Sequence, residues 1–257
     1  MAPRHILITG ASSGIGAALA RRYAGPQSRL ALGGRDLQRL EAVATACRER
    51  RAAVSARAIN VRDRSAMHDW ILGEDDAVPL DLVIANAGIG AQEGFGAESE
   101  ARAREVFAVN LEGVLNTAYP AIERMAARSR GQLALMSSLA GCRGFPDAPA
   151  YSASKAAVKA LAEAWRGALG PHGIRVSVIC PGFVETPMTA RNKFPMPFLI
   201  SADRAAAIID AGLLHDVPRI AFPWPMVLGT WILTALLPAR LADRILAPRT
   251  RKPAKSC

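Results

Sequence analysis

The sequence predicts a doubly wound α/β fold, in which a parallel sheet of about seven strands carries helices on both faces. Short runs rich in Leu, Ile and Val alternate with longer stretches rich in Ala, Arg and Glu. Several of the short runs are continuously apolar, as expected of strands that are covered on both faces. Regular alternation of strand and helix implies parallel strands joined by right-handed crossovers.

The predicted elements follow one another along the chain without a break. The apolar runs place strands at 5–10, 29–34, 54–60, 80–88, 131–138, 174–182 and 219–222. Helical patterns begin near Gly14, Asp36, Ser65, Ser99 and Tyr151. No Gly/Ser linker or Pro-rich spacer divides the chain, so we expect one catalytic domain over 1–219. Residues 220–257 are then an apolar helix followed by a basic tail.

The composition is that of an ordinary globular protein, with 257 residues of which 51% are hydrophobic and 21% charged. The first ten residues contain an apolar run that is too short for a secretory signal, so we expect a cytoplasmic protein. The cysteines are widely spaced and show no C-x-x-C pattern, which predicts neither a disulfide framework nor a metal site. They are Cys47, Cys142, Cys180 and Cys257.

The formal net charge of +10 raises the question of an anionic partner. About half of the excess lies at the end of the chain, where only Asp243 opposes Arg240, Arg244, Arg249, Arg251, Lys252 and Lys255. No zinc finger, aromatic RNP motif or heptad-bearing basic region accompanies these residues, so nucleic-acid binding is not expected. An anionic membrane surface is a possible partner.

A glycine-rich turn, TGASSGIG, follows the first predicted strand and opens the first helix. Gly10 permits a tight turn, Gly14 lets the backbone approach a pyrophosphate, and Gly16 allows the helix to pack closely on the sheet. The helix N-terminus then offers unpaired N–H groups to the phosphates. A Gly-rich turn that only caps a helix is the plain alternative. The cofactor residues expected in this turn are Gly10, Ser12, Ser13, Gly14, Ile15 and Gly16.

Arg35 and Asp36 follow the second predicted strand. A cation beside a helix N-terminus is unfavourable unless an anion compensates it, and the 2′-phosphate of NADP would do so. An NAD-binding protein usually has an acidic residue near this place, but Asp36 is also a good helix N-cap. NADP(H) is therefore favoured over NAD(H), with a solvated Arg35 as the structural alternative.

Tyr151 and Lys155 stand four residues apart in "YSASK", which places them on one face of a helix. A phenol has a pKa near ~10, and a neighbouring ammonium lowers it towards neutral pH. Such a pair suits a proton donor and acceptor, which a hydride-transfer enzyme needs when a carbonyl oxygen gains a proton. Tyr and Lys also meet at this spacing on many solvated helices, so the pair needs support from other positions.

Supporting positions lie at the ends of other predicted strands. Ser138 closes the fifth strand, where its hydroxyl can donate to a substrate carbonyl or simply stabilise a turn. Asn110 interrupts a helical stretch and either anchors a water towards Lys155 or satisfies a backbone group. "NAG" at 86–88 and "PGFVETPM" at 181–188 follow the fourth and sixth strands at the level of the crevice.

Taken together, these motifs resemble the short-chain dehydrogenase/reductase family over residues 3–188. The resemblance implies a strand order of 3-2-1-4-5-6-7, a nicotinamide cofactor, a small carbonyl or alcohol substrate, and a homodimer or homotetramer. It also implies a catalytic tetrad in which Tyr151 is the acid/base, Ser138 orients the carbonyl, Lys155 lowers the pKa of Tyr151 and holds the ribose, and Asn110 supports a proton relay. Further cofactor positions are Arg35, Asn60, Val61, Asn86, Ala87, Gly88, Tyr151, Lys155, Pro181, Gly182, Val184 and Thr186.

The sequence departs from the family pattern in two places. The family often has Asp-Val after the third strand, whereas this chain has Asn60 and Val61, and Asn still offers an amide oxygen and a donor to adenine. Beyond Met188 the resemblance fades.

Residues 220–239 carry no charge. The prolines at 223, 225 and 238 limit a helix to Met226–Leu237, about 18 Å long, which is short of a ~30 Å hydrocarbon core. This helix packs on the subunit or its dimer mate, dips into one leaflet at the inner face of a membrane, or forms a lid over an apolar substrate.

The function predicted from these residues is NADP(H)-dependent interconversion of a carbonyl and an alcohol on a hydrophobic substrate, with Tyr151 as the acid/base. The alternative is a non-catalytic nucleotide-binding scaffold at a membrane surface. The identity of the substrate, the direction of the reaction and its stereochemistry are not encoded in a recognisable pattern.

Overall fold

The structure is a computed structural model that describes residues 3–90, 98–192 and 194–246. One sheet of seven strands, all parallel, forms the centre of the protein in the order β3-β2-β1-β4-β5-β6-β7, as the resemblance implied. The strands are β1 (His5–Thr9), β2 (Arg29–Gly34), β3 (Ala53–Ala58), β4 (Leu82–Ala85), β5 (Gly131–Met136), β6 (Ile174–Pro181) and β7 (Arg219–Phe222). Each overlaps a predicted apolar run.

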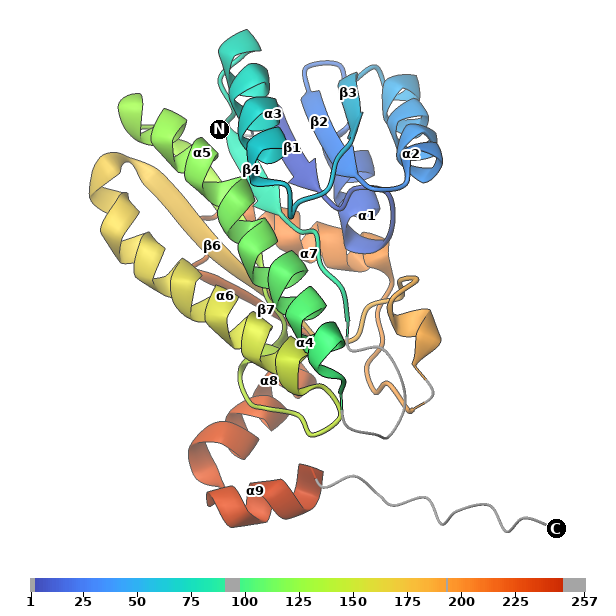
Figure 1. The fold of residues 1–257 in the computed structure, drawn as a ribbon, viewed down its shortest axis with the longest axis vertical. Helices are drawn as coiled ribbons and strands as arrows, with labels where there is room; N and C mark the ends of the chain where they lie inside the picture. Colours follow the sequence, from blue (N-terminus) through green and yellow to red (C-terminus); the bar gives the residue numbers. More distant parts are fainter. Residues whose placement is uncertain (1–2, 91–97, 193, 247–257) are drawn as a thin grey trace, which may run out of the picture.

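Two hydrophobic clusters cover the two faces of this sheet (Figure 1). One face packs against α1 (Gly14–Tyr23), α2 (Leu37–Glu49) and α7 (Ala202–Leu214). The other packs against α3 (Arg64–Ala77), α5 (Gly113–Ala127) and α6 (Pro149–Leu169), with α4 (Glu100–Phe107) beside α6. Strands β1, β4, β5 and β6 are almost entirely buried because helices cover both of their faces. The doubly wound, Rossmann-type fold predicted from the sequence is confirmed.

Polar side chains define where several helices begin. Asp36 and Ser99 each accept a hydrogen bond from the backbone N–H three residues ahead, as the N-caps of α2 and α4. Asp63 caps α3 in the same way, so this helix begins one residue before the predicted Ser65. Pro149 opens α6 two residues before Tyr151, where its missing N–H costs no hydrogen bond.

The C-terminal part differs from the predicted helix Met226–Leu237. Helix α8 (Trp224–Trp231) begins two residues earlier, since Pro225 is tolerated in the first turn. A π-helical turn, Ile232–Leu236, follows it, and α9 (Ala239–Leu246) forms a separate short helix. Among the described residues, no helix has the length and apolar character needed to cross a membrane.

The proposed division of the chain between residues 219 and 220 falls inside β7. This strand pairs with β6 along its whole length, from Val178 opposite Arg219 to Pro181 opposite Phe222. Ile220–Phe222 therefore belongs to the sheet, and only the helices after it extend beyond the central body (Figure 1).

Candidate active site

The loops that follow β1, β4 and β6 meet at the carboxyl edge of the sheet. A β-carbon placed on Gly10 would lie 2.8 Å from the Cα atom of Ala87, and one on Gly14 would lie 2.9 Å from the Thr186 methyl group. Three segments that are far apart in the sequence therefore touch at this edge. Parallel sheets of this kind hold their ligands in the crevice beyond the carboxyl ends of the strands.

Hydrogen bonds hold the glycine-rich turn in one shape. Thr9 Oγ1 accepts from the backbone N–H groups of Asn86 and Ala87, both at 3.1 Å. The Asn86 side chain donates back to the carbonyls of Thr9 at 2.9 Å and Gly10 at 3.2 Å. A β-carbon on Gly16 would lie only 2.3 Å from the Gly10 oxygen and 2.6 Å from Asn86 Nδ2. The first turn of α1 thus packs directly against this network.

The N-terminus of α1 is suited to an anion. Ser13 occupies the N-cap position in extended conformation without a side-chain bond to the helix, and the first turn contains no acidic residue. Backbone N–H groups at 14–16 and the positive end of the helix dipole thus face the crevice without a carboxylate competitor. Gly10 takes a φ of +68°, which lets the chain turn tightly beneath this point. These features fit the diphosphate of a dinucleotide.

The loop after β2 separates the two charges predicted to compete there. Asp36 accepts from the Arg39 backbone N–H at 3.0 Å and pairs with Arg39 Nε at 2.6 Å, and the backbone bond is the main cause that lowers its pKa. Arg35 is exposed and forms no hydrogen bond or ion pair with the rest of the described chain. Ser12 lies close by, 3.3 Å through Oγ from a β-carbon placed on Gly34. The cation, rather than the carboxylate, is available to a ligand.

Asn60 and Val61 lie in the turn between β3 and α3. Asn60 Oδ1 accepts from the Arg62 backbone N–H at 3.2 Å, which leaves its amide N–H groups and one lone pair of the oxygen for a ligand. Val61 is buried against Gly113, and its carbonyl accepts from Asn116 Nδ2 at 2.9 Å. The side chain of Asn60 therefore has less freedom towards adenine than the sequence suggested.

Lys155 is buried on α6 below the end of β5. Its Nζ donates to the Met136 carbonyl at 2.8 Å and lies 5.8 Å from the centroid of the Tyr151 ring. The two side chains share a helix face, as their spacing predicted. Burial lowers the pKa of Lys155 to about 8, because the charged form loses solvation.

Burial also raises the pKa of Tyr151, while a hydrogen bond with the Ser138 side chain acts in the opposite direction. The sequence predicted that the Lys155 ammonium would lower this pKa. In the structure desolvation of the phenolate outweighs the favourable contact, so the phenol is held protonated. A protonated phenol is the state that a proton donor requires.

Ser138 sits two residues after the end of β5 and caps a short 3₁₀ turn. Its Oγ accepts from the Ala140 backbone N–H at 3.1 Å and donates to the Pro181 carbonyl at 3.3 Å. The hydroxyl therefore serves the turn, and the Ser138 side chain also acts to lower the pKa of Tyr151. Both roles considered for it from the sequence are compatible with this geometry.

The segment after β6 closes the crevice on the far side. Thr189 Oγ1 donates to the Val184 carbonyl at 2.6 Å and accepts from the Thr186 backbone N–H at 2.9 Å. A β-carbon on Gly182 would meet Met226 Sδ at 2.6 Å, so α8 packs over this loop.

Asn110 lies in a π-helical turn, Ala108–Glu112, and is completely buried. Its Oδ1 accepts from Ile89 N–H at 2.8 Å, and its Nδ2 donates to the Ile89 carbonyl at 3.0 Å and to Ser154 Oγ at 3.1 Å. The structure shows the backbone bonding predicted for it, and the water leading towards Lys155 stays a prediction. A β-carbon on Gly88 would lie 3.2 Å from Asn110 Oδ1 and 3.3 Å from Lys155 Nζ, so a side chain there would have to push one of these polar groups aside.

Three buried hydroxyl groups that support these residues were not predicted from the sequence. Thr9 braces the glycine-rich turn, Ser137 Oγ donates to the Lys155 carbonyl at 2.6 Å, and Ser154 Oγ donates to the Tyr151 carbonyl at 2.8 Å. Each stands next to, or one residue from, a residue that was recognised. The sequence shows them beside these residues in "ITG", "MSS" and "SASK". It does not show which groups their hydroxyls bond to.

A family model described as short chain dehydrogenase matches residues 4–195 of this chain. The chain belongs to the short-chain dehydrogenase/reductase family. It is 36% identical over 244 residues to an uncharacterized oxidoreductase of Myxococcus xanthus, covering 95% of this chain and 96% of the relative. It is 31% identical over 189 residues to the 3-oxoacyl-(acyl-carrier-protein) reductase of Thermotoga maritima, covering 72% and 76%.

The solved structure of a short chain dehydrogenase from Mycobacterium paratuberculosis bound to NAD is also similar. It superposes with a TM-score of 0.75 at 25% identity, over 85% of this chain and 94% of that one. Family membership and these relatives make this protein an NAD(P)-dependent dehydrogenase or reductase that acts on CH–OH or C=O groups. They do not favour the scaffold alternative.

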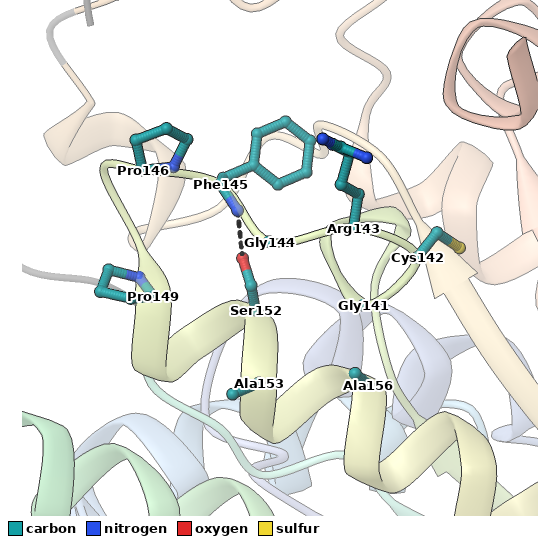
Figure 2. A pocket seen from close by; sticks show the side chains of 10 residues that line it. All are labelled: Gly141, Cys142, Arg143, Gly144, Phe145, Pro146, Pro149, Ser152, Ala153 and Ala156. Atoms are coloured by element: carbon teal, nitrogen blue, oxygen red, sulfur yellow. Dashed lines mark hydrogen bonds between the residues drawn. The ribbon is translucent and has the colours of Figure 1, made fainter. Parts of the chain in front are cut away.

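A cavity of about 550 Å³ lies beside α6 (Figure 2). None of the residues that line it belongs to the predicted catalytic tetrad. Ser152, Ala153 and Ala156 line it from α6. Their spacing along the sequence places them on a different helix face from Tyr151 and Lys155. The cavity therefore belongs to the outer side of the loop before α6.

We predict that Gly16→Ala weakens NADPH binding roughly tenfold or more, because the added methyl group displaces the Gly10 carbonyl or the Asn86 amide. Fluorescence titration with NADPH measures the affinity, and circular dichroism checks the fold. Gly25→Ala is the matched control, since a β-carbon there meets nothing within 4 Å. Equal affinities in both variants contradict this description of the turn.

A second prediction concerns the buried ammonium. Because Lys155 loses its proton near pH 8 in the folded protein and near 10.5 when unfolded, unfolding takes up a proton between these values. The free energy of unfolding of the wild type should therefore rise, relative to that of Lys155→Met, by roughly 3 kcal/mol from pH 8 to 10.5. Urea unfolding of both proteins across this range measures it, and parallel curves would show that Lys155 is not desolvated.

Proposed function

We propose that this protein is an NADP(H)-dependent oxidoreductase that interconverts a carbonyl and an alcohol on a hydrophobic substrate. The observation that carries the proposal is the convergence of Tyr151, Ser138 and Lys155 beside the glycine-rich turn. The nicotinamide group, when bound, supplies or accepts the hydride. The residues of the chain handle the proton and hold the reactants.

In the reducing direction, Tyr151 gives its hydroxyl proton to the substrate oxygen while the carbonyl carbon gains the hydride, and the C=O bond becomes CH–OH. Ser138 donates a hydrogen bond to the same oxygen and polarises the carbonyl. Lys155 binds a ribose hydroxyl and supports the phenolate that remains. Asn110 holds the loop at Ile89 and, through Ser154, the backbone of Tyr151. The oxidation reverses each step.

The proposed preference for NADP(H) rests on the loop after β2. The Asp36 carboxylate is already committed to capping α2 and to Arg39, so it is poorly placed to bind the ribose hydroxyls as in an NAD-binding protein. The exposed Arg35 offers a guanidinium to a 2′-phosphate, and Ser12 adds a hydroxyl nearby. The NAD-bound relative shows that the family itself does not dictate this choice.

A hydrophobic substrate is supported by the side chains around the mouth of the crevice. Met188 packs against Gly90, and Met226 packs against Gly182. The segment between β6 and α7 exposes Phe194, Phe198 and Leu199. The relative from Thermotoga maritima is named for an acyl ketone, which agrees with a substrate of this kind.

We place this enzyme in the cytoplasm as a homodimer or homotetramer, with a catalytic domain that extends through β7 to Phe222 rather than ending at residue 219. Tyr119 on α5 is 57% exposed and meets Trp165 of α6 edge-on at 5.4 Å. These two rings form an aromatic patch that suits contact with a second copy.

Tyr151→Phe should lower the rate of NADPH oxidation with hydrophobic ketones by about 100-fold or more, because the proton donor is lost. NADPH affinity should change little, since the ring is kept. Tyr119→Phe, an exposed tyrosine away from the crevice, is the control. A Tyr151→Phe enzyme with the wild-type rate, or a wild type that binds NADPH but reduces no ketone of a varied panel, overturns the proposed activity.

Arg35→Ala should weaken NADPH binding roughly tenfold, the worth of a charge-assisted hydrogen bond, and leave NADH binding unchanged. Arg175→Ala is the matched control, because Arg175 is an exposed arginine at the opposite end of the sheet on β6. Fluorescence titrations with both nucleotides give the two affinities. Equal losses for NADPH and NADH, or no loss for either, exclude Arg35 as the selecting residue.

A further inference from the structure

The helices after β7 form a projecting unit at one end of the molecule, away from α1, α2 and α3 (Figure 1). We call this unit, Trp224–Leu246, the C-terminal foot. It contains α8, the π-helical turn and α9. Arg143, in the loop before α6, pairs with Asp243 of α9 at 2.5 Å and ties the end of the foot to the body.

Helix α8 has two faces with different surroundings. Met226 and Val227 pack against the hydrophobic cluster on one face of the sheet, and Met226 covers Gly182 at the crevice. On the other face, Trp224, Leu228 and Trp231 follow one another at i, i+4 and i+7 with exposed fractions of 75%, 47% and 53%. The outer face is thus a continuous apolar stripe that no described part of the chain covers.

The stripe continues beyond α8. Apolar side chains that are at least one third exposed occur through the π-helical turn and α9, namely Ile232, Leu236, Leu241 and Ile245. Singly exposed apolar residues are ordinary on a protein surface, but seven within one short unit mark an interaction surface.

The charge on the foot is positive. Arg240 and Arg244 of α9 form no ion pair with other described residues, whereas Asp243 is neutralised by Arg143. After Asp243 the sequence contains no further acidic residue, and it adds Arg249, Arg251, Lys252 and Lys255. Apolar side chains flanked by unpaired cations are the combination that binds an anionic lipid surface.

We propose that the C-terminal foot docks this enzyme on the surface of an anionic membrane. The apolar stripe enters the boundary between headgroups and acyl chains, and the arginines contact the lipid phosphates. Trp224 and Trp231 suit this boundary, since their rings are apolar with one polar N–H. The foot lies on the membrane and does not cross it, in keeping with the short helices described. Because Met226 of the same helix packs at the crevice, docking brings the crevice to the acyl-chain region; this last step rests on the hydrophobic substrate proposed above.

Charge argues against a second copy of the chain as the occupant. Two feet that paired face to face would bring both sets of arginines together in a partly desolvated interface, and like charges there are unfavourable. A lipid surface carrying negative charge removes this conflict. Self-association through the foot is therefore the alternative that an experiment must separate.

The test uses the full-length protein and flotation with vesicles of phosphatidylcholine, with or without phosphatidylserine. The protein should bind the vesicles that contain phosphatidylserine, bind pure phosphatidylcholine more weakly, and lose binding as salt is raised. Trp224→Ser/Trp231→Ser should weaken binding roughly tenfold or more through lost apolar burial. Arg240→Gln/Arg244→Gln should weaken binding to the vesicles that contain phosphatidylserine and leave binding to pure phosphatidylcholine unchanged.

Matched controls are Leu214→Ser, an apolar residue of α7 that is 53% exposed, and Arg175→Gln. Neither should change flotation. The proposal is overturned if the wild type does not bind anionic vesicles, or if the foot variants bind as well as the controls. It is also overturned if the tryptophan variant lowers the oligomer mass in analytical ultracentrifugation while vesicle binding is absent, which assigns the foot to a second copy.

NADPH oxidation with a dispersed ketone, measured without vesicles, separates this proposal from the enzymatic one. Foot variants that float poorly but keep this rate support membrane docking and leave the catalytic assignment intact. A wild type that floats but reduces no ketone supports the docking surface and removes the proposed activity.

Discussion

The site depends on a lysine ammonium that is buried beneath the end of a β-strand. Lys155 reaches the Met136 carbonyl through its side chain, and its own carbonyl accepts from Ser137, so β5 and α6 are joined in both directions. Gly141 allows a third contact, because a β-carbon there would lie 2.6 Å from the Lys155 backbone. A charge in such surroundings is costly, and the cost is met only where nearby groups hold the helix and strand in one register. The positions of Tyr151 and Ser138 follow from this junction.

The other half of the crevice is built mainly from backbone. Asn86 donates to Thr9 through both its backbone and its side chain and so joins the loops after β1 and β4. The first turn of α1 packs on them without space for a side chain at Gly16. Backbone N–H groups and a helix dipole bind an anion without a cationic side chain. This leaves Arg35, at the next strand, to distinguish between two cofactors that share the same diphosphate.

The place of β7 in the sheet brings the C-terminal foot next to the crevice. Strand β7 ends beside β6 at the same edge that carries the tetrad, so the helix that follows it starts over the loop at Gly182. A helix so placed has one face towards the crevice and one towards the surroundings. The apolar outer face of α8, followed by the basic helix α9, is therefore exposed next to the mouth of the site.

The sequence by itself determined the seven strands, their parallel arrangement, the cap at Asp36 and the pairing of Tyr151 with Lys155 on one helix face, because these follow from local periodicity and from motifs. It did not determine the direction in which the pKa of Tyr151 moves, since desolvation depends on residues from distant elements that surround the phenol. The partners of Asn110, the bracing roles of Thr9, Ser137 and Ser154, and the two faces of α8 were likewise decided by tertiary structure. Each depends on contacts between segments that are far apart in the sequence. The packing of the helices on the sheet alone decides how these segments lie relative to one another.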